Sequence, residues 1–288
     1  MANHPPLKID PDKLQHGLGS EPFAVHHDLV DNPLLTLDAI ADLADYLPAD
    51  SIEHNLGDLP EVLPDADAVT RLDLSPGEIV RTVESNRSWM VLKWIERHPD
   101  YRDLLEQTLS EVTSAVAVTD GPVHGREGFI FISAPNSVTP SHIDPEYNFL
   151  LQTRGTKEMV VGRHASSEAE LETVERYYGG AHRNIDLTPE NAQTFEMNPG
   201  DGVFVPLHAP HLVRNGPEPS ISLSVTWSTE ESKRVAALHS VNARLRSLHL
   251  SPAAPGARPA VDRVKLSGYL AARSAARAAR RIRTRQPA

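Results

Sequence analysis

The sequence of 288 residues contains no cysteine. The protein therefore has no disulfide bond, no thiolate metal ligand and no cysteine nucleophile, so histidine and carboxylate side chains must hold any bound metal. There is also no stretch of about 18 apolar residues, which argues against a membrane-spanning helix. The first ten residues, MANHPPLKID, lack the basic and then apolar order of a secretory signal. We expect a soluble, cytoplasmic protein that does not act at a membrane.

Acidic residues are nearly absent from the end of the chain. Residues 232–288 contain many lysines and arginines but a single acid, Asp262, although the whole chain has a formal net charge of -11. Such a basic segment can bind nucleic acid, the acidic body of its own chain or a second subunit. We expect a protein contact and consider nucleic acid an unlikely partner.

Hydrophobic spacing predicts an N-terminal region of mostly helical structure, residues 1–120. Residues 22–29 are typical of a short strand, and residues 35–47 have their apolar side chains at helical spacing. The composition of residues 50–73, rich in Pro, Asp and Gly, predicts a loop. Residues 75–116 predict two helical segments separated near His98 and Pro99.

A change of pattern at Gly121 predicts an antiparallel sheet region over residues 121–229. Short β-branched and aromatic runs there are separated by Gly, Pro, Asn and Asp, as in barrels and jelly rolls. A helical insert at 166–178 and a loop at 179–193 interrupt these strands. Helical spacing returns in residues 231–248 and 261–283, so residues 230–288 are predicted to form a basic helical extension.

A possible metal site begins with His142 and Asp144. These side chains are two residues apart, so on an extended strand both project to one face and can bind one ion. A third ligand is expected from the run NPGDGVFVPLHAPHLVRNG, which offers His208 and His211. Two histidines and one carboxylate leave coordination positions open for a co-substrate and O₂, as in non-haem iron(II) oxygenases. An H-x-D pair alone is common by chance, and its strand context favours the metal site.

The same residues resemble the cupin-like branch of the JmjC oxygenases, and the sequence is similar to the asparaginyl hydroxylase of hypoxia-inducible factor. The T-P-x-H-x-D signature is present as Thr139 to Asp144, followed by Asn148-Phe149, and Arg154 to Lys157 match its K-G-x-K hairpin. Pro199-Gly200-Asp201, Pro206 and His211 match its second strand motif. Ala209-Pro210 replace the usual aromatic pair, so the pocket near that histidine is expected to differ.

The resemblance implies a double-stranded β-helix, or jelly roll, with flanking helices. It also implies that His211, and not His208, completes the metal triad with His142 and Asp144. Lys157 would bind the distal carboxylate of 2-oxoglutarate with help from the Thr139 hydroxyl, and Asn148 and Thr226 would hydrogen-bond the co-substrate or a water at the metal. The expected cofactors are Fe(II) and 2-oxoglutarate.

Other candidate residues are more simply explained by structure. Four arginines are predicted on loops around the mouth of the barrel, where they could meet an acidic substrate group, but surface arginines are common: Arg154, Arg163, Arg183 and Arg214. The three tryptophans, Trp89, Trp94 and Trp227, are more often core residues than substrate platforms.

The implied activity is hydroxylation of an unactivated C–H bond in an amino-acid, peptide, protein or natural-product substrate, with release of CO₂ and succinate. Demethylation of an N-methyl group would use the same chemistry. The main alternative is a catalytically silent cupin that recognises a ligand, and a second is a metal-dependent cupin isomerase or lyase. The resemblance and the apolar spacing in residues 231–248 further imply a homodimer through the C-terminal helices.

Overall fold

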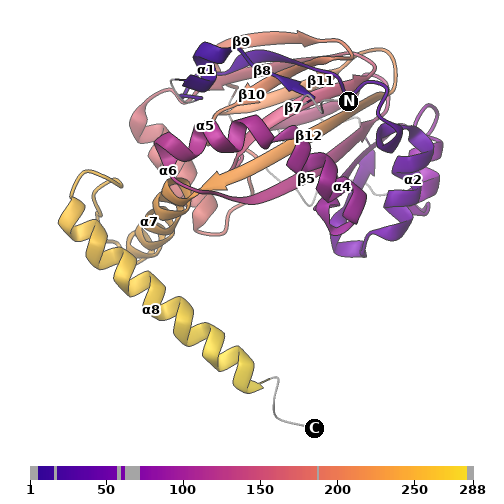
Figure 1. Ribbon diagram of the computed structural model, residues 1–288. Coiled ribbons are helices and arrows are strands. Elements are labelled where there is room, and N and C mark those ends of the chain that lie inside the picture. Colours follow the sequence, from indigo (N-terminus) through magenta and orange to yellow (C-terminus); the bar gives the residue numbers. More distant parts are fainter. Residues whose placement is uncertain (1–5, 16–17, 57–59, 62–71, 187, 284–288) are drawn as a thin grey trace. The chain divides into compact units, whose positions relative to one another are not determined.

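The computed structural model describes residues 6–15, 18–56, 60–61, 72–186 and 188–283. It consists of two compact units, and the chain passes between them three times. Unit 1 contains residues 1–166 and 182–230, and unit 2 contains residues 167–181 and 231–288. Figure 1 shows the elements along the chain. Within the described ranges, every helix is too short or too polar to cross a membrane.

Unit 1 is a jelly roll of two antiparallel sheets. The larger sheet has the strand order β1-β2-β10-β7-β12-β5-β4-β3, and the smaller has the order β6-β11-β8-β9. From β5 to β12, successive strands alternate between the sheets except at the β8–β9 hairpin, which is the topology the sequence predicts. The strands are β1 (Leu7–Lys8), β2 (Phe23–His27), β3 (Ile52–Leu56), β4 (Ser88–Lys93), β5 (Val123–Ser133), β6 (Val138–His142), β7 (Tyr147–Arg154), β8 (Lys157–Arg163), β9 (Glu190–Met197), β10 (Asp201–Val205), β11 (His211–Asn215) and β12 (Ser220–Thr229).

The space between the two sheets has an apolar part and a part lined by hydroxyl side chains. Leu150 of β7 packs there with residues of the smaller sheet such as Met159 and Val213. Leu150 is paired in register with Ser224 of β12, so the alternation of side chains along β12 turns its serines and threonine inward. Four small hydroxyl residues of β12 therefore lie on its inner face: Ser220, Ser222, Ser224 and Thr226.

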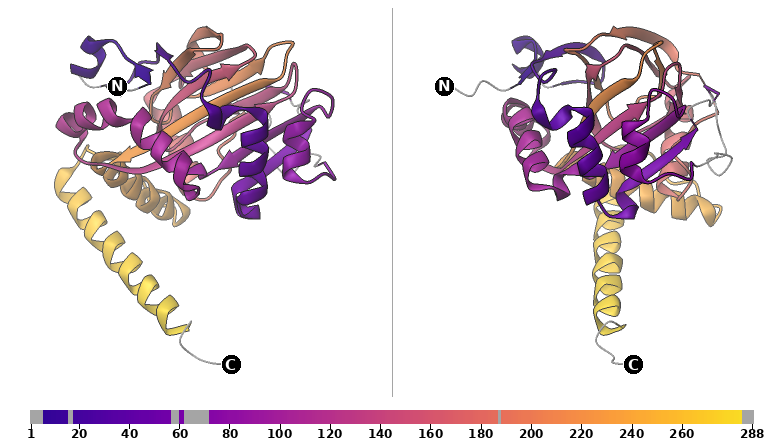
Figure 2. Two further views of the ribbon diagram at one scale, coloured as in Figure 1. Left: turned by 45° about the vertical axis from the view of Figure 1, so that its right-hand side comes forward. Right: turned by 90° about the vertical axis from the view of Figure 1, so that its right-hand side faces the viewer.

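The outer face of the larger sheet is covered by helices. The apolar positions of β12, from Ile221 to Trp227, share one core cluster with buried residues of α2 (Leu37–Tyr46), α4 (Pro99–Thr108) and α5 (Ser110–Asp120). Figure 2 shows these helices against that sheet. Their starts follow from the sequence, since the Thr36 hydroxyl caps α2 and His98 caps α4 just before Pro99. The shorter helices of the described residues are α1 (Pro11–Gln15), α3 (Pro76–Arg81) and the 3₁₀ turns η1 (Pro33–Leu35), η2 (Ala49–Ser51) and η4 (Ile95–Arg97).

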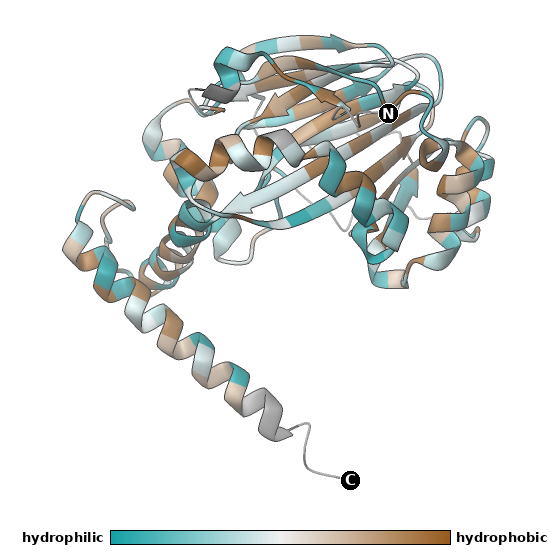
Figure 3. Cartoon of the chain, in the orientation of Figure 1, coloured by the Kyte–Doolittle hydropathy of each residue, from teal (hydrophilic) through white to brown (hydrophobic). Residues whose placement is uncertain are grey.

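Unit 2 consists of α6 (Ser167–Tyr178) with most of α7 (Glu230–Ser247) and α8 (Pro259–Arg283). Its interior is polar: the buried Glu175 of α6 accepts a hydrogen bond from the Asn242 side chain at 2.9 Å and pairs with Arg246. Lys265 of α8 donates to the Asn242 oxygen at 2.7 Å. Figure 3 shows hydrophobic and hydrophilic residues alternating along α8. The domain boundaries expected from the sequence stay a prediction.

Most predicted elements are confirmed, and three expectations are wrong. The range 75–116 was expected to be helical but contains strand β4, the range 50–73 contains strand β3, and the loop predicted at 179–193 includes the start of β9. Five of the six residues of β4 are buried, because it lies between β3 and β5 with both faces covered. A short apolar run buried on both faces has no period that distinguishes a strand from a helix.

Candidate metal centre

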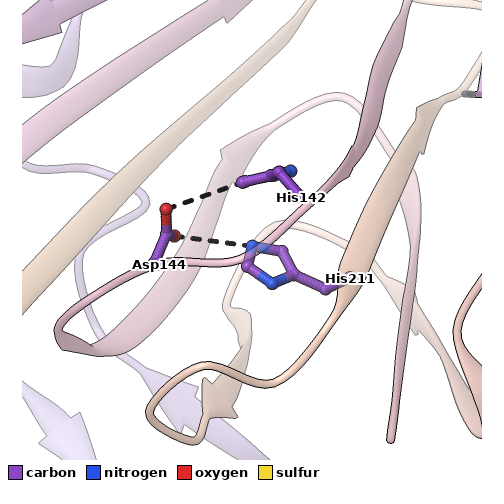
Figure 4. Close-up of side chains that lie close together, drawn as sticks. All are labelled: His142, Asp144 and His211. Carbon is purple, nitrogen blue, oxygen red and sulfur yellow. Dashed lines mark ion pairs between the residues drawn. The ribbon is translucent and has the colours of Figure 1, made fainter. Parts of the chain in front are cut away.

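Two histidines and one aspartate meet at the end of the smaller sheet. His142 is the last residue of β6, His211 is the first of β11, and the two are paired in register. Asp144 lies two residues beyond β6. One ligand atom from each residue lies within 4.8 Å of the others, and Figure 4 shows Asp144 facing both imidazole rings. The structure therefore brings together all three residues that the sequence predicts.

Hydrogen bonds orient both imidazoles for metal binding. The Nδ1 atoms of His142 and His211 lie 2.8 Å from the carbonyl oxygens of Pro140 and Ala209. Because a carbonyl can only accept, each Nδ1 carries the proton, and each Nε2 is left with a free lone pair. The two Nε2 atoms face the Asp144 carboxylate at 3.9 and 3.5 Å.

The protonation states at the site also suit a cation. Burial lowers the pKa of His142 well below its ordinary value, and the neighbouring His211 and Arg183 lower it further. Burial alone would raise the pKa of Asp144, but the histidines and Arg183 outweigh burial and lower it below the usual range. The site thus offers the neutral imidazole of His142 and the carboxylate of Asp144 beside the Nε2 lone pair of His211. This donor set fits a divalent transition metal with open coordination positions.

Lys157 lies on the inner face of the smaller sheet, which also carries His142 and His211. Its side chain is buried, and among the described residues it has no hydrogen-bond or ion-pair partner. Burial lowers the pKa of Lys157 to about 7. The turn that places it needs Gly155, whose φ is 68° and where a Cβ would collide with the Pro219 carbonyl. A buried ammonium group without an anion is costly, so this lysine fits a site for an anionic ligand.

The other predicted ligand-binding residues also face the interior. Trp89 Nε1 donates to the Thr139 hydroxyl at 3.1 Å, which leaves the hydroxyl hydrogen of Thr139 to donate elsewhere. Ser224 donates to the Asn148 side-chain oxygen at 2.7 Å, so the amide nitrogen of Asn148 is the group that can donate to a ligand. The Thr226 hydroxyl donates to the Glu127 carbonyl at 3.3 Å. The roles assigned to these residues stay predictions.

Of the four arginines expected at the mouth, the structure places one at the metal centre. Arg183 lies 3.1 Å from Asp144. The expectation that the other three lie on loops is wrong: each is on a strand and has its own acidic partners. Arg154 pairs with Glu84, Arg163 with Glu21, and Arg214 with Glu61 and Glu158.

The other candidate histidine, His208, and the tryptophans have structural roles, and the half-buried Trp94 donates its indole hydrogen bond to Glu127 at 3.0 Å. His208 has a φ of 59°, and its backbone nitrogen donates to the Asp144 carbonyl at 3.1 Å, so it shapes the loop before β11. Trp227 is a fully buried core residue, as predicted. Trp89 is also buried, but its bond to Thr139 gives it a place at the site that sequence reasoning missed.

Glu146 is an acidic neighbour of the metal centre that the sequence did not single out. Burial raises its pKa to about 8, and the nearby Asp144 and Glu127 add to the shift. In the sequence, only its position two residues after Asp144 could have identified Glu146 as part of the site.

Comparison with known proteins finds one matching domain family and several solved structures of similar fold. Residues 103–235 match the family model of the JmjC domain, whereas no curated protein sequence matches significantly. An X-ray structure of E. coli ycfD is 15% identical, with 92% of this chain and 67% of that chain covered and a TM-score of 0.53. A crystal structure of the Escherichia coli ribosomal oxygenase YcfD is 15% identical, with 92% and 66% covered and a TM-score of 0.50.

These structural matches support the jelly roll with flanking helices. The chain spans about two thirds of the length of the YcfD chains, 67% and 66%, and at this identity the likeness shows the fold alone. A specific likeness to the asparaginyl hydroxylase of hypoxia-inducible factor stays a prediction.

Proposed function

We propose that this chain, whose residues 103–235 match the JmjC domain, is a 2-oxoglutarate-dependent oxygenase that hydroxylates an unactivated C–H bond with release of CO₂ and succinate. The cofactors of such a domain are iron(II) and 2-oxoglutarate. The observation that best supports the proposal is that the two histidines of the His-Asp-His donor set share the inner face of one sheet with a buried lysine that lacks an anionic partner among the described residues.

The proposed roles follow from the donor and acceptor chemistry of each side chain. His142, Asp144 and His211 would hold iron(II) through Nε2 and carboxylate atoms. Lys157 would neutralise the distal carboxylate of 2-oxoglutarate, to which Thr139 would donate a hydrogen bond. Asn148 and Thr226 would hydrogen-bond the co-substrate or a water at the metal.

When bound, iron(II) with 2-oxoglutarate and O₂ supplies the oxidising power for the reaction. The protein's own work is to bind, orient and exclude water. The Nδ1 hydrogen bonds of His142 and His211 hold both rings in one tautomer and orientation. The apolar cluster between the sheets, which includes Leu150 and Met159, lowers the polarity around Lys157 and strengthens its attraction for a carboxylate.

A protein side chain is the substrate class that we would test first. The similar structure is named a ribosomal oxygenase, which supports a protein substrate, ribosomal proteins included. Free amino acids, natural-product intermediates and N-methyl groups remain alternatives, because fold alone does not select a substrate. Oxidised products would be recognised by a mass increase of one oxygen atom, or by formaldehyde release in the case of demethylation. The cytoplasmic location expected from the sequence stays a prediction.

Purified protein with iron(II), ascorbate and air is expected to form succinate from 2-oxoglutarate, slowly in the absence of its substrate. The His142→Ala variant should form none, because one metal ligand is missing. The matched control is His124→Ala, which removes an exposed histidine and should leave succinate formation unchanged.

The same assay separates the oxygenase from the alternative functions. Wild-type protein that forms no succinate and shows no calorimetric binding of 2-oxoglutarate would contradict the proposal in favour of the silent cupin. Binding of metal without binding of 2-oxoglutarate would instead favour an isomerase or lyase.

We further propose that the partner of unit 2 is a second copy of the chain. On α8, Val264 is 73% exposed and Leu270 is 63% exposed, so these side chains offer apolar surface for a dimer contact. We expect sedimentation velocity to show a dimer and the double variant Val264→Glu, Leu270→Glu to shift it to a monomer. Val118→Glu, at an apolar residue of α5 that is 86% exposed, is the control that should stay dimeric. A monomeric wild type would contradict this proposal.

A further inference from the structure

The segment of residues 182–185 runs alongside the end of the strand that carries the first metal ligand. Asn184 forms an antiparallel bridge with His142. The Ile143 nitrogen donates to the Arg183 carbonyl at 3.1 Å, and the Ile185 nitrogen donates to the Ser141 carbonyl at 2.9 Å. Because these bonds flank His142 on both sides, the backbone of Arg183 is fixed in relation to the ligands.

The Arg183 side chain uses this position to contact a metal ligand directly. Its Nη1 atom lies 3.1 Å from Asp144 Oδ1. The side chains are 32% and 15% exposed, so the ion pair is partly shielded from solvent. Asp144 Oδ1 is 3.9 Å from His142 Nε2, and Oδ2 is 3.5 Å from His211 Nε2, so the guanidinium group holds a carboxylate that already faces both imidazoles.

We propose that Arg183 is a positioning residue that orients the Asp144 carboxylate for the metal. The proposal rests on the metal site proposed above. A free aspartate side chain rotates and can turn either oxygen away from an ion, whereas a guanidinium bond to one oxygen limits that rotation. Arg183 would thereby keep the carboxylate between the two Nε2 atoms before the ion arrives. It would act through Asp144 and would touch neither the co-substrate nor the reacting atoms.

Two other roles for Arg183 predict different results. If the guanidinium merely takes the place of the cation, removing it should make metal binding tighter, because a competitor is gone. If Arg183 serves only to bind an acidic substrate group, removing it should leave metal affinity unchanged. The sign of the change in metal affinity therefore distinguishes all three roles.

The test is the affinity of the metal-free protein for Co(II), measured by calorimetry and by the visible absorption of the bound ion. We expect Arg183→Gln to weaken Co(II) binding by about 10- to 100-fold, the usual effect of losing a group that orients a ligand. Arg183→Lys should recover part of the loss, because it keeps a cation. Arg154→Gln, which breaks a surface pair with Glu84, is the matched control and should bind Co(II) like wild type.

The outcomes separate this role from the proposed function. At saturating Co(II), the variants should bind 2-oxoglutarate nearly as well as wild type, because Lys157 is intact. Unchanged or tighter Co(II) binding in a folded Arg183→Gln protein would overturn the positioning role while leaving the metal site in place. A wild type that binds no Co(II) would overturn the metal site itself, and this role with it. Circular dichroism would verify folding, and Arg183→Lys serves as the test protein if Arg183→Gln does not fold.

Discussion

Replacing Asp144 with alanine is expected to abolish both metal binding and succinate formation. Asp144 supplies the only carboxylate of the donor set, and without it the two histidines share no anion to balance a divalent charge. The loss should exceed the roughly 10- to 100-fold effect of removing a group that only orients a ligand. Calorimetry with Co(II) and the succinate assay would measure the two effects separately.

The matched control for this variant is Asp42→Ala, which removes an aspartate that is 80% exposed and pairs with Arg81. It should bind Co(II) and form succinate at wild-type levels. If the Asp144→Ala protein still turns over 2-oxoglutarate, then His142, Asp144 and His211 are not the set of metal ligands.

Replacing Lys157 with alanine is expected to weaken 2-oxoglutarate binding by about 30-fold to several thousand-fold. The range corresponds to the roughly 2–5 kcal/mol lost when one member of a buried charge pair is truncated. Co(II) affinity should change little, because Lys157 is not a metal ligand. Calorimetric titration of 2-oxoglutarate into the Co(II)-loaded protein would measure the effect. An unchanged affinity would contradict the role proposed for Lys157.

The pKa of Lys157 gives this binding a predicted pH dependence. Burial lowers that pKa to about 7, so in the free protein Lys157 is charged below pH 7 and becomes neutral as the pH rises. Above pH 7, a carboxylate can pair with it only after a proton is taken up, and affinity should fall by up to about tenfold per pH unit. Lys157→Arg keeps its charge throughout and should bind with little dependence on pH. A flat profile for the wild type would contradict the role of the lowered pKa.

The three residues of the candidate metal site were predictable from local spacing together with a family resemblance. His142 and Asp144 are two residues apart on extended backbone, and His211 follows a strand motif that the family resemblance identified. Residue spacing alone left His208 and His211 as alternatives. The structure separates them by backbone position, since His211 is paired in register with His142.

The contacts of Arg183 and Trp89 could not be predicted in the same way. Arg183 reaches Asp144 because residues 182–185 lie alongside the end of β6. No local sequence pattern predicts this pairing. Trp89 lies on β4, a strand that the sequence did not distinguish from a helix. Its indole bond to Thr139 depends on how β4 and β6 are placed in the two sheets. Contacts between distant segments depend on tertiary packing and carry no periodic signal.

The buried Glu175 affects when unit 2 can fold during synthesis of the chain. Its partners, Asn242 and Arg246, lie on α7, which follows α6 in the chain after four strands, β9 to β12. During synthesis, α6 leaves the ribosome with an unpaired carboxylate that stays hydrated until α7 follows. Burying that charge alone would be costly, so unit 2 closes only after α7 has been synthesised. A chain shortened before residue 231 would leave α6 without its partners.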